Sequence, residues 1–138
     1  MASIPADAGM KIGALAALSG LSVKTLRFYE DQGLLPALGR SPGGYRLFSE
    51  ESLRRVAFIR RLKALGLSLD DIRQCLVVHD AGQLPCADLQ QQLELQIERI
   101  DGRITELEQL RQELRQTLQG WQRAPRRQGD EICPNLQV

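Results

Sequence analysis

The sequence has little of what most enzymes and disulfide-rich proteins need. Of its 138 residues one is a histidine and three are cysteines, Cys75, Cys86 and Cys133. So sparse and odd a set argues against a disulfide scaffold, and it makes thiol or metal chemistry the question to ask. The sequence also lacks a nucleophile motif and a glycine-rich phosphate loop followed by lysine. We therefore expect a protein that is not an enzyme.

Long apolar runs and a secretion signal are missing as well. No run approaches the roughly 20 residues that a membrane helix needs, and the N-terminus has no charged-then-apolar pattern. We expect a cytoplasmic protein with no membrane partner.

The net charge of +1 hides an uneven distribution. Residues 1–68 hold ten Lys and Arg against five Asp and Glu, whereas residues 69–138 hold eight against twelve. A basic first half attached to an acidic second half favours binding of a polyanion by the first half.

The basic half begins with the pattern of two short helices. Residues 1–9 show no periodicity, so we expect a flexible tail there. Apolar residues then recur at helical spacing until Gly20, and Ser22 is a suitable N-cap for a second helix that starts near Val23. In that second helix we expect Phe28 to point inward, with its neighbours Arg27 and Tyr29 facing outward.

Turn and helix signals follow in close order. The glycine pair after Pro42 predicts a β-hairpin turn. Ser49 is a candidate cap for a third helix that ends at Gly66, and Ser68 is a candidate cap for a fourth. A basic helix-turn-helix with a hairpin indicates a winged-helix head, whose second helix enters the major groove of DNA.

The longest periodic segment runs from about Cys86 to Gln119. Steps of three and four residues between apolar positions, sustained over more than four heptads, predict a coiled coil about 50 Å long. A head of this size cannot cover such a helix, so we expect a second chain to cover it. The apolar positions are Leu89, Leu93, Ile97, Ile100, Ile104, Leu107, Leu110, Leu114 and Leu118.

Three stretches together resemble a MerR-family transcription regulator, closest to the heavy-metal-responsive branch. They are "KIGALAALSGLSVKTLRFYEDQGLLP", "GGYRLFSEESLRRVAFIRRLKALGLSLDDIR" and the long helix that follows. The resemblance implies a mainly α fold in which a winged helix-turn-helix head precedes a long antiparallel coiled-coil dimerisation helix and a C-terminal loop. The implied domains are a tail at 1–9, a head at 10–80, a coiled coil at 81–119 and an effector-binding loop and tail at 120–138.

The resemblance also implies a function. Such homodimers bind palindromic operators in double-stranded promoter DNA. An effector changes the geometry of the heads, so that the DNA is bent and undertwisted and RNA polymerase is affected indirectly. The residues that match the family's DNA contacts are Lys24, Arg27 and Tyr29 in the second helix, Tyr45 and Arg46 in the wing, and Arg60 and Arg61 beyond it.

Two cysteines match the positions of metal ligands in the family. Cys86 stands at the start of the long helix, and Cys133 lies in the C-terminal "ICPNL". Across an antiparallel dimer these thiolates would suit Zn(II), Cd(II), Hg(II), Pb(II) or Cu(I). The match is incomplete, because Trp121 stands about where the family's loop has a further cysteine. One loop thiolate cannot by itself form a two-coordinate Cu(I) site.

Several alternatives remain open for the effector. His79, Asp130 or Glu131 could complete a metal site, or the two thiols could sense redox change or electrophiles through an inter-chain disulfide. The loop could instead bind a non-metal ligand, such as an anion, through Arg123, Arg126 and Arg127. Cys75 is expected to be a buried apolar residue, and a lone tail cysteine disfavours an iron–sulfur cluster. A coiled-coil adaptor is the alternative from another class, but it leaves the basic head unexplained.

Overall fold

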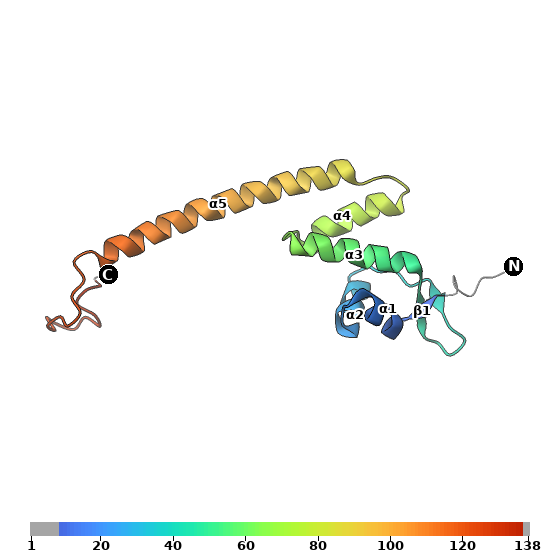
Figure 1. Ribbon diagram of the computed structural model, residues 1–138, viewed down its shortest axis with the longest axis horizontal. Coiled ribbons are helices and arrows are strands. Elements are labelled where there is room, and N and C mark those ends of the chain that lie inside the picture. Colours follow the sequence, from blue (N-terminus) through green and yellow to red (C-terminus); the bar gives the residue numbers. More distant parts are fainter. Residues whose placement is uncertain (1–8, 137–138) are drawn as a thin grey trace. The chain divides into compact units, whose positions relative to one another are not determined.

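The computed structural model of the chain describes residues 9–136 (Figure 1). The expected flexible tail lies outside these residues, except for Gly9. The described residues form two compact units, the first ending at Glu94 and the second beginning at Leu95. Among the helices described, none is long and apolar enough to cross a membrane.

The predicted helix-turn-helix is present at the start of the first unit. The first helix, α1 (Ile12–Ser19), ends at Gly20, whose φ of 76° is a left-handed conformation that suits glycine. The second helix, α2 (Val23–Asp31), begins after Ser22. The Ser22 hydroxyl accepts a hydrogen bond of 3.1 Å from the backbone N–H of Thr25, which confirms Ser22 as the N-cap.

A small three-stranded sheet follows in the order β1-β3-β2, with both pairings antiparallel. The strands β2 (Gly39–Arg40) and β3 (Arg46–Phe48) form the predicted hairpin. Strand β1 (Met10–Lys11) was not predicted. Two residues are too short to show an alternating pattern. Strand β1 exists because Met10 and Lys11 pair with the side of β3 that faces away from β2.

The next two helices are α3 (Glu50–Ala64) and α4 (Leu69–Asp80). Ser49 occupies the N-cap position of α3, but its side chain makes no capping hydrogen bond, so the predicted cap is wrong in this respect. The two glutamates of the first turn supply the negative charge that favours a helix start. Ser68 does cap α4, in a reciprocal capping box with Asp71.

The core of the first unit draws apolar side chains from α1 to α4, from β3 and from the connecting loops. Each fully buried large side chain contributes about 1.5–3 kcal/mol through its removal from water. The buried members are Leu15, Leu26, Tyr29, Leu34, Leu35, Phe48, Val56, Ile59, Leu62, Leu67, Ile72 and Leu76.

Arg55 on α3 joins three parts of this unit. Its Nε donates to the backbone oxygen of Leu34, at 2.5 Å, just after α2. Its Nη1 and Nη2 donate to the two carboxylate oxygens of Asp80, at 2.6 and 3.0 Å, at the end of α4. The Arg55 side chain is 9% exposed, whereas that of Asp80 is 53% exposed. The nearly buried cation therefore depends on these two partners.

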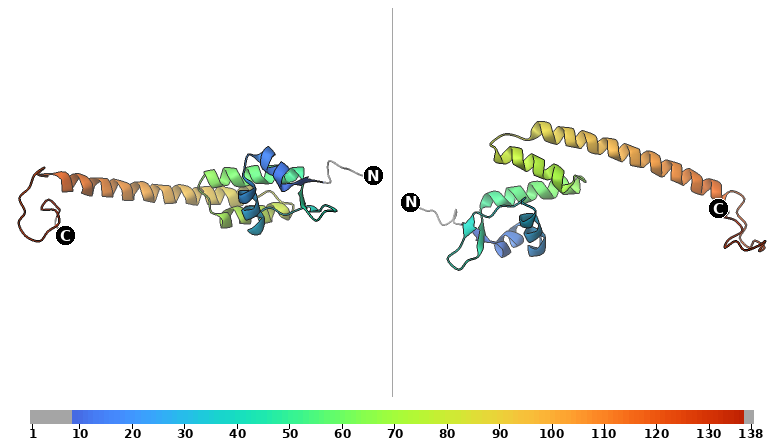
Figure 2. Two further views of the ribbon diagram at one scale, coloured as in Figure 1. Left: turned by 90° about the horizontal axis from the view of Figure 1, so that it is seen from below. Right: turned by 180° about the vertical axis from the view of Figure 1, so that it is seen from behind.

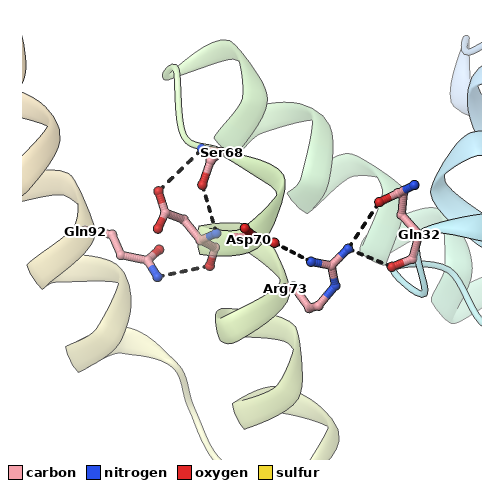
Figure 3. Close-up of polar contacts among 6 residues, drawn as sticks. Gln32, Ser68, Asp70, Arg73 and Gln92 are labelled. Carbon is pink, nitrogen blue, oxygen red and sulfur yellow. Dashed lines mark hydrogen bonds and ion pairs between the residues drawn. The ribbon is translucent and has the colours of Figure 1, made fainter.

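The long helix α5 (Cys86–Leu118) begins inside the first unit. Leu89 and Leu93 are half-buried against the core, and Gln92 between them is buried. The Gln92 amide donates to the backbone oxygen of Asp71 at 3.0 Å (Figure 3). These contacts attach the start of α5 to α4.

On its other side α4 is attached to the end of α2. The Arg73 side chain donates through Nη2 to the backbone oxygen of Gln32 at 2.8 Å, and its Nη1 donates to Asp70 at 2.6 Å. Figure 3 shows α4 between these two attachments, with Gln92 reaching it from α5 and Arg73 reaching away toward Gln32.

In the second unit α5 leaves a row of apolar side chains exposed. Ile100 and Ile104 are 46% and 48% exposed, although their spacing is that of a helix-packing stripe. After Gly120, residues 121–136 contain no helix or strand (Figure 2), as the loss of periodicity predicted. The other exposed members of the stripe in this unit are Ile97, Leu107, Leu110, Leu114 and Leu118.

The contact between Arg55 and Asp80 leads to a test of stability against pH. The hydrogen bond from Arg55 lowers the pKa of the Asp80 carboxyl below its usual value. Because the pKa is lower in the folded chain, the stabilisation is fully present above the unfolded-state pKa of about 3.9. It is lost as the pH falls through the folded-state pKa.

We expect Asp80→Ala to lower the free energy of unfolding by about 1–3 kcal/mol at neutral pH, since it leaves a nearly buried guanidinium with unmatched donors. Urea unfolding followed by circular dichroism, at one protein concentration, measures the difference, which should shrink in acid. Asp70→Ala is the matched control, because Asp70 is 87% exposed in its ion pair with Arg73. Its effect should stay below about 0.5 kcal/mol, and equal losses in the two variants would contradict the role given to Asp80.

Candidate nucleic-acid interface and cysteine positions

The outward face of α2 differs from the prediction in one respect. Lys24 and Arg27 are exposed as expected. Tyr29, however, is 8% exposed and belongs to the core, whereas Phe28 is 47% exposed. The two rings therefore have the reverse of their predicted orientations. The reason is helical spacing, because Tyr29 shares a face with Leu26, three residues earlier, and Leu26 is fully buried.

The hairpin is held in shape by its own side chains. Arg40 donates through Nη1 to the backbone oxygen of Gly44 at 2.9 Å, and the Ser41 hydroxyl accepts from the backbone N–H of Tyr45 at 3.1 Å. The Tyr45 ring is 59% exposed, and the Lys11 ammonium lies 4.0 Å from its centroid. This cation–π contact places a positive charge from β1 beside the hairpin.

An ion pair joins the hairpin to α2. Arg46 Nη1 lies 2.5 Å from Glu30 Oε2, and Glu30 is 11% exposed while Arg46 is 48% exposed. The acidic partner is thus covered, and the guanidinium that covers it still faces solvent. The pair fixes the position of the hairpin relative to α2, and it leaves part of the Arg46 donor set available to an anion.

Between α2 and the hairpin lies a hollow of about 320 Å³. The basic side chains that line it come from three separate segments of the chain. Two carboxylates also line it, and both belong to α2. Positive charge gathered in a concave surface concentrates the electrostatic field that attracts phosphate. The residues that line it are Lys11, Ile12, Arg27, Glu30, Asp31, Arg40, Gly44, Tyr45, Arg46 and Phe48.

The structure therefore brings Arg27 of α2 together with Tyr45 and Arg46 of the hairpin around one hollow. Lys11 and Arg40 belong to the same surface but were not predicted. Their signal in the sequence was slight, because each is a single basic residue next to glycine or apolar residues. Only the pairing of β1 and β2 with β3 carries them to the hollow.

Arg60 and Arg61 lie elsewhere, along a second hollow of about 480 Å³ between α1 and α3. Arg60 donates through Nη1 to the backbone oxygen of Ser19 at 2.9 Å, so it also stabilises the end of α1. Arg61 is exposed on the same helix. Of the two, Arg61 is therefore the simpler probe of a phosphate contact.

Cys75 is fully buried on α4, as predicted. Its Sγ donates to Gln92 Oε1 at 3.4 Å. Burial, and to a lesser extent the charges of Asp88 and Asp71, raise the pKa of the Cys75 thiol. A thiol with a raised pKa and no access to solvent is a poor nucleophile and a poor metal ligand.

The other two cysteines are accessible. Cys86 is exposed as the first residue of α5, and Cys133 is half-buried in the segment that follows that helix. His79 lies on α4, where its Nε2 is 3.2 Å from Glu51 Oε1 of α3. Within residues 9–136 no three His, Cys, Asp or Glu side chains gather closely enough to hold a metal ion. The described part of one chain thus supplies single thiols and no assembled metal site.

Comparison with known proteins identifies the architecture. The model described as "MerR HTH family regulatory protein" matches residues 10–77, and the model described as "MerR, DNA binding" matches residues 53–117. Both descriptions are of regulatory or DNA-binding proteins. Together the two matches cover the head and nearly all of α5.

Individual relatives agree with these matches. The HTH-type transcriptional regulator ZntR homolog of Haemophilus influenzae is 39% identical over 105 residues, which cover 76% of this chain and 78% of that protein. The mercuric resistance operon regulatory protein of Bacillus cereus is 32% identical over 128 residues, covering 93% and 95%.

A solved structure shows the same fold. The crystal structure of the transcription regulator PbrR691 from Ralstonia metallidurans in complex with lead(II) superimposes with a TM-score of 0.75 at 36% identity. The match covers 84% of this chain and 91% of that one. With a winged head, a long helix and relatives of this similarity over most of its length, the chain belongs to the MerR family of DNA-binding transcriptional regulators.

Proposed function

We propose that the chain acts as a homodimer that binds a palindromic operator in promoter DNA and responds to a thiophilic metal ion through Cys86 and Cys133. On this proposal residues 10–80 bind DNA, 81–119 dimerise and 120–138 bind the effector. The observation that carries it is the position of the two accessible thiols, one at the first residue of α5 and one beyond the last.

The DNA-binding part rests on the hollow beside α2. We propose that α2 enters the major groove with Arg27 and Lys24 foremost, while Tyr45 and Arg46 of the hairpin contact the adjacent backbone. Phe28 takes the outward place that was predicted for Tyr29, because it is the exposed ring. Lys11 and Arg40 add positive charge to the same surface.

The dimer rests on the exposed stripe of α5. Seven large apolar side chains between Ile97 and Leu118 are each 46–61% exposed in the single chain. A contiguous apolar face of this kind is covered in a stable soluble protein, and a second copy of the helix offers a complementary stripe. If the two helices run antiparallel, the start of each lies beside the end of the other.

That arrangement explains how two separate thiols could form one site. Cys86 of one chain would then lie near the C-terminal segment of its partner, and that segment carries the partner's Cys133. Soft thiolates favour Zn(II), Cd(II), Hg(II), Pb(II) and Cu(I). The mercuric regulator and the lead-bound regulator among the similar proteins support a metal of this class.

The small number of available thiols also favours a second candidate function, which is sensing of an oxidant. Because the described residues offer no group of three ligands, two thiols are the most that the proposal can rely on within the chain. Two thiols are also the minimum for an inter-chain disulfide, formed when a two-electron oxidant such as a peroxide takes two electrons and two protons from them. If neither thiol takes part in sensing, the favoured effector becomes an anion bound by Arg123, Arg126 and Arg127.

A first prediction concerns the dimer. Ile100→Asp or Ile104→Asp should convert the dimer to monomer at micromolar concentration, because pairing would bury an unpaired carboxylate. Analytical ultracentrifugation measures the change. Gln109→Asp, on the opposite side of α5 from the stripe, is the matched control and should stay dimeric. A folded wild-type monomer at the same concentration would rule out the proposed dimer.

A second prediction separates base contacts from phosphate contacts. The probes are a duplex selected from a random pool by the wild-type protein and a scrambled duplex of the same composition. Arg61→Ala should weaken binding to both similarly and reduce the slope of log affinity against log salt by about 1 per chain. Arg27→Ala should weaken the selected duplex by about 1–3 kcal/mol more than the scrambled one. Equal losses on both duplexes for Arg27→Ala would exclude it from base recognition.

A third prediction concerns the thiols. Cys86→Ser and Cys133→Ser should each abolish tight binding of Zn(II), Cd(II), Hg(II) or Pb(II) to the purified dimer and the metal-dependent change in transcription, while affinity for the selected duplex is unchanged. Cys75→Ser is the control, because its hydroxyl can still donate to Gln92. Loss of a response to hydrogen peroxide but not to metal would favour the redox candidate. A full metal response in both variants would show that the thiols are not the sensor.

A further inference from the structure

The C-terminal segment is closed by one side chain. The Asn135 Oδ1 accepts a hydrogen bond of 2.9 Å from the backbone N–H of Gln122, and its Nδ2 donates to the backbone oxygen of Gln122 at 2.7 Å. The segment from Gln122 to Asn135 is therefore a loop whose two ends are held together, as in an Ω-loop. Asn135 is the only asparagine of the chain.

Both ends of this closure are themselves fixed. On one side the backbone N–H of Trp121 donates to the oxygen of Leu118, the last residue of α5, at 3.1 Å. On the other side the backbone N–H of Leu136 donates to the oxygen of Cys133 at 3.1 Å. That bond closes a β-turn in which Cys133 is the first residue, Pro134 the second and Asn135 the third. Cys133 is thus two residues from the anchor and inside the same turn.

We infer that Asn135 is a positioning residue for Cys133: by clamping the backbone of Gln122, it holds the Cys133 thiol at the end of α5. This inference rests on the proposed role of Cys133 and deepens it. In the proposed dimer a metal ion draws on thiolates from two chains, so the affinity depends on each thiolate being held where its partner can share the ion. An unclamped loop would lose that advantage, because ordering it on binding has an entropic cost.

The chemistry of asparagine suits this role. Its side-chain amide presents one acceptor and one donor side by side, so it can pair with the N–H and the C=O of one residue. Aspartate offers acceptors only, and it would place negative charge against the Gln122 oxygen. Glutamine carries the same groups on a longer and more mobile stem. The clamp therefore predicts that even the nearly isosteric Asn135→Asp loses much of the function.

The experiment compares Asn135→Ala and Asn135→Asp with wild type in the full-length dimer. Metal binding is measured by competition titration with Zn(II) and Cd(II). Loss of an outer partner that orients a metal ligand lowers affinity by about 10–100-fold, and we expect that decrease here. Gln128→Ala is the matched control, because it removes an amide of the same loop, in which Gln128 uses only its backbone N–H in the hydrogen bond to Glu131. It should bind metal like wild type.

A second readout reports on the thiol itself, without metal. The rate at which Cys133 reacts with a soluble disulfide reagent, followed by mass spectrometry of the peptide that contains it, should change severalfold in both Asn135 variants. The rate at Cys86 should not change. Circular dichroism and the affinity for the selected duplex should match wild type, which shows that the head and α5 remain folded.

The outcomes distinguish this inference from the proposed function. If Cys133→Ser abolishes metal binding but Asn135→Ala and Asn135→Asp bind like wild type, the clamp has no positioning role and the inference is overturned. An unchanged reaction rate of Cys133 in both Asn135 variants overturns it as well. If Cys133→Ser itself binds metal like wild type, the proposed function fails, and the reaction rates alone then decide whether Asn135 fixes the thiol.

Discussion

The arrangement of the DNA-binding head depends on a nearly buried cation. The Arg55 side chain is nearly buried, and a buried guanidinium whose donors lack acceptors is costly. Its acceptors must therefore lie where α3 positions the guanidinium. Those partners are the backbone just after α2, at Leu34, and the last residue of α4, Asp80. One side chain on α3 therefore fixes both the backbone just after α2 and the end of α4, the helix that precedes α5.

The basic surface between α2 and the hairpin is assembled from segments that are distant in sequence. Glu30 has a covered carboxylate on an otherwise basic surface, and its ion pair with Arg46 is what attaches the hairpin to α2. The same pairing of strands places Lys11 over the Tyr45 ring. A free carboxylate on a basic surface would repel an anion, but the Glu30 carboxylate is paired with Arg46 and helps to set the geometry of the surface. The result is a concave surface on which four basic side chains outnumber the two carboxylates, Glu30 and Asp31.

The second unit has the opposite character, because it leaves the large apolar side chains of α5 exposed within one chain. The head covers the first apolar positions of α5, Leu89 and Leu93, and the later ones remain exposed. The accessible thiols are separate in the same way, since Cys86 begins α5 and Cys133 lies in the segment that follows it. Within the described residues the local order of this unit beyond α5 comes from backbone turns, from the clamp at Asn135 and from the Glu131 carboxylate, which accepts from the backbone N–H of Gln128. A second copy of the chain is the partner that we propose to cover the apolar stripe.

The sequence by itself determined the elements whose signals are local. Ser22 and Gly20 set the limits of α1 and α2, the glycine pair after Pro42 set the hairpin, and the repeat of apolar residues set α5, because capping, positive φ and periodicity act within a few residues. Only the tertiary structure decided which of Phe28 and Tyr29 faces outward. Adjacent aromatic residues give a helix two comparable apolar faces, and the choice follows from where the core lies. The same holds for β1 and for the Asn135 clamp, which exist through contacts between residues far apart in the chain and so leave no local pattern to read.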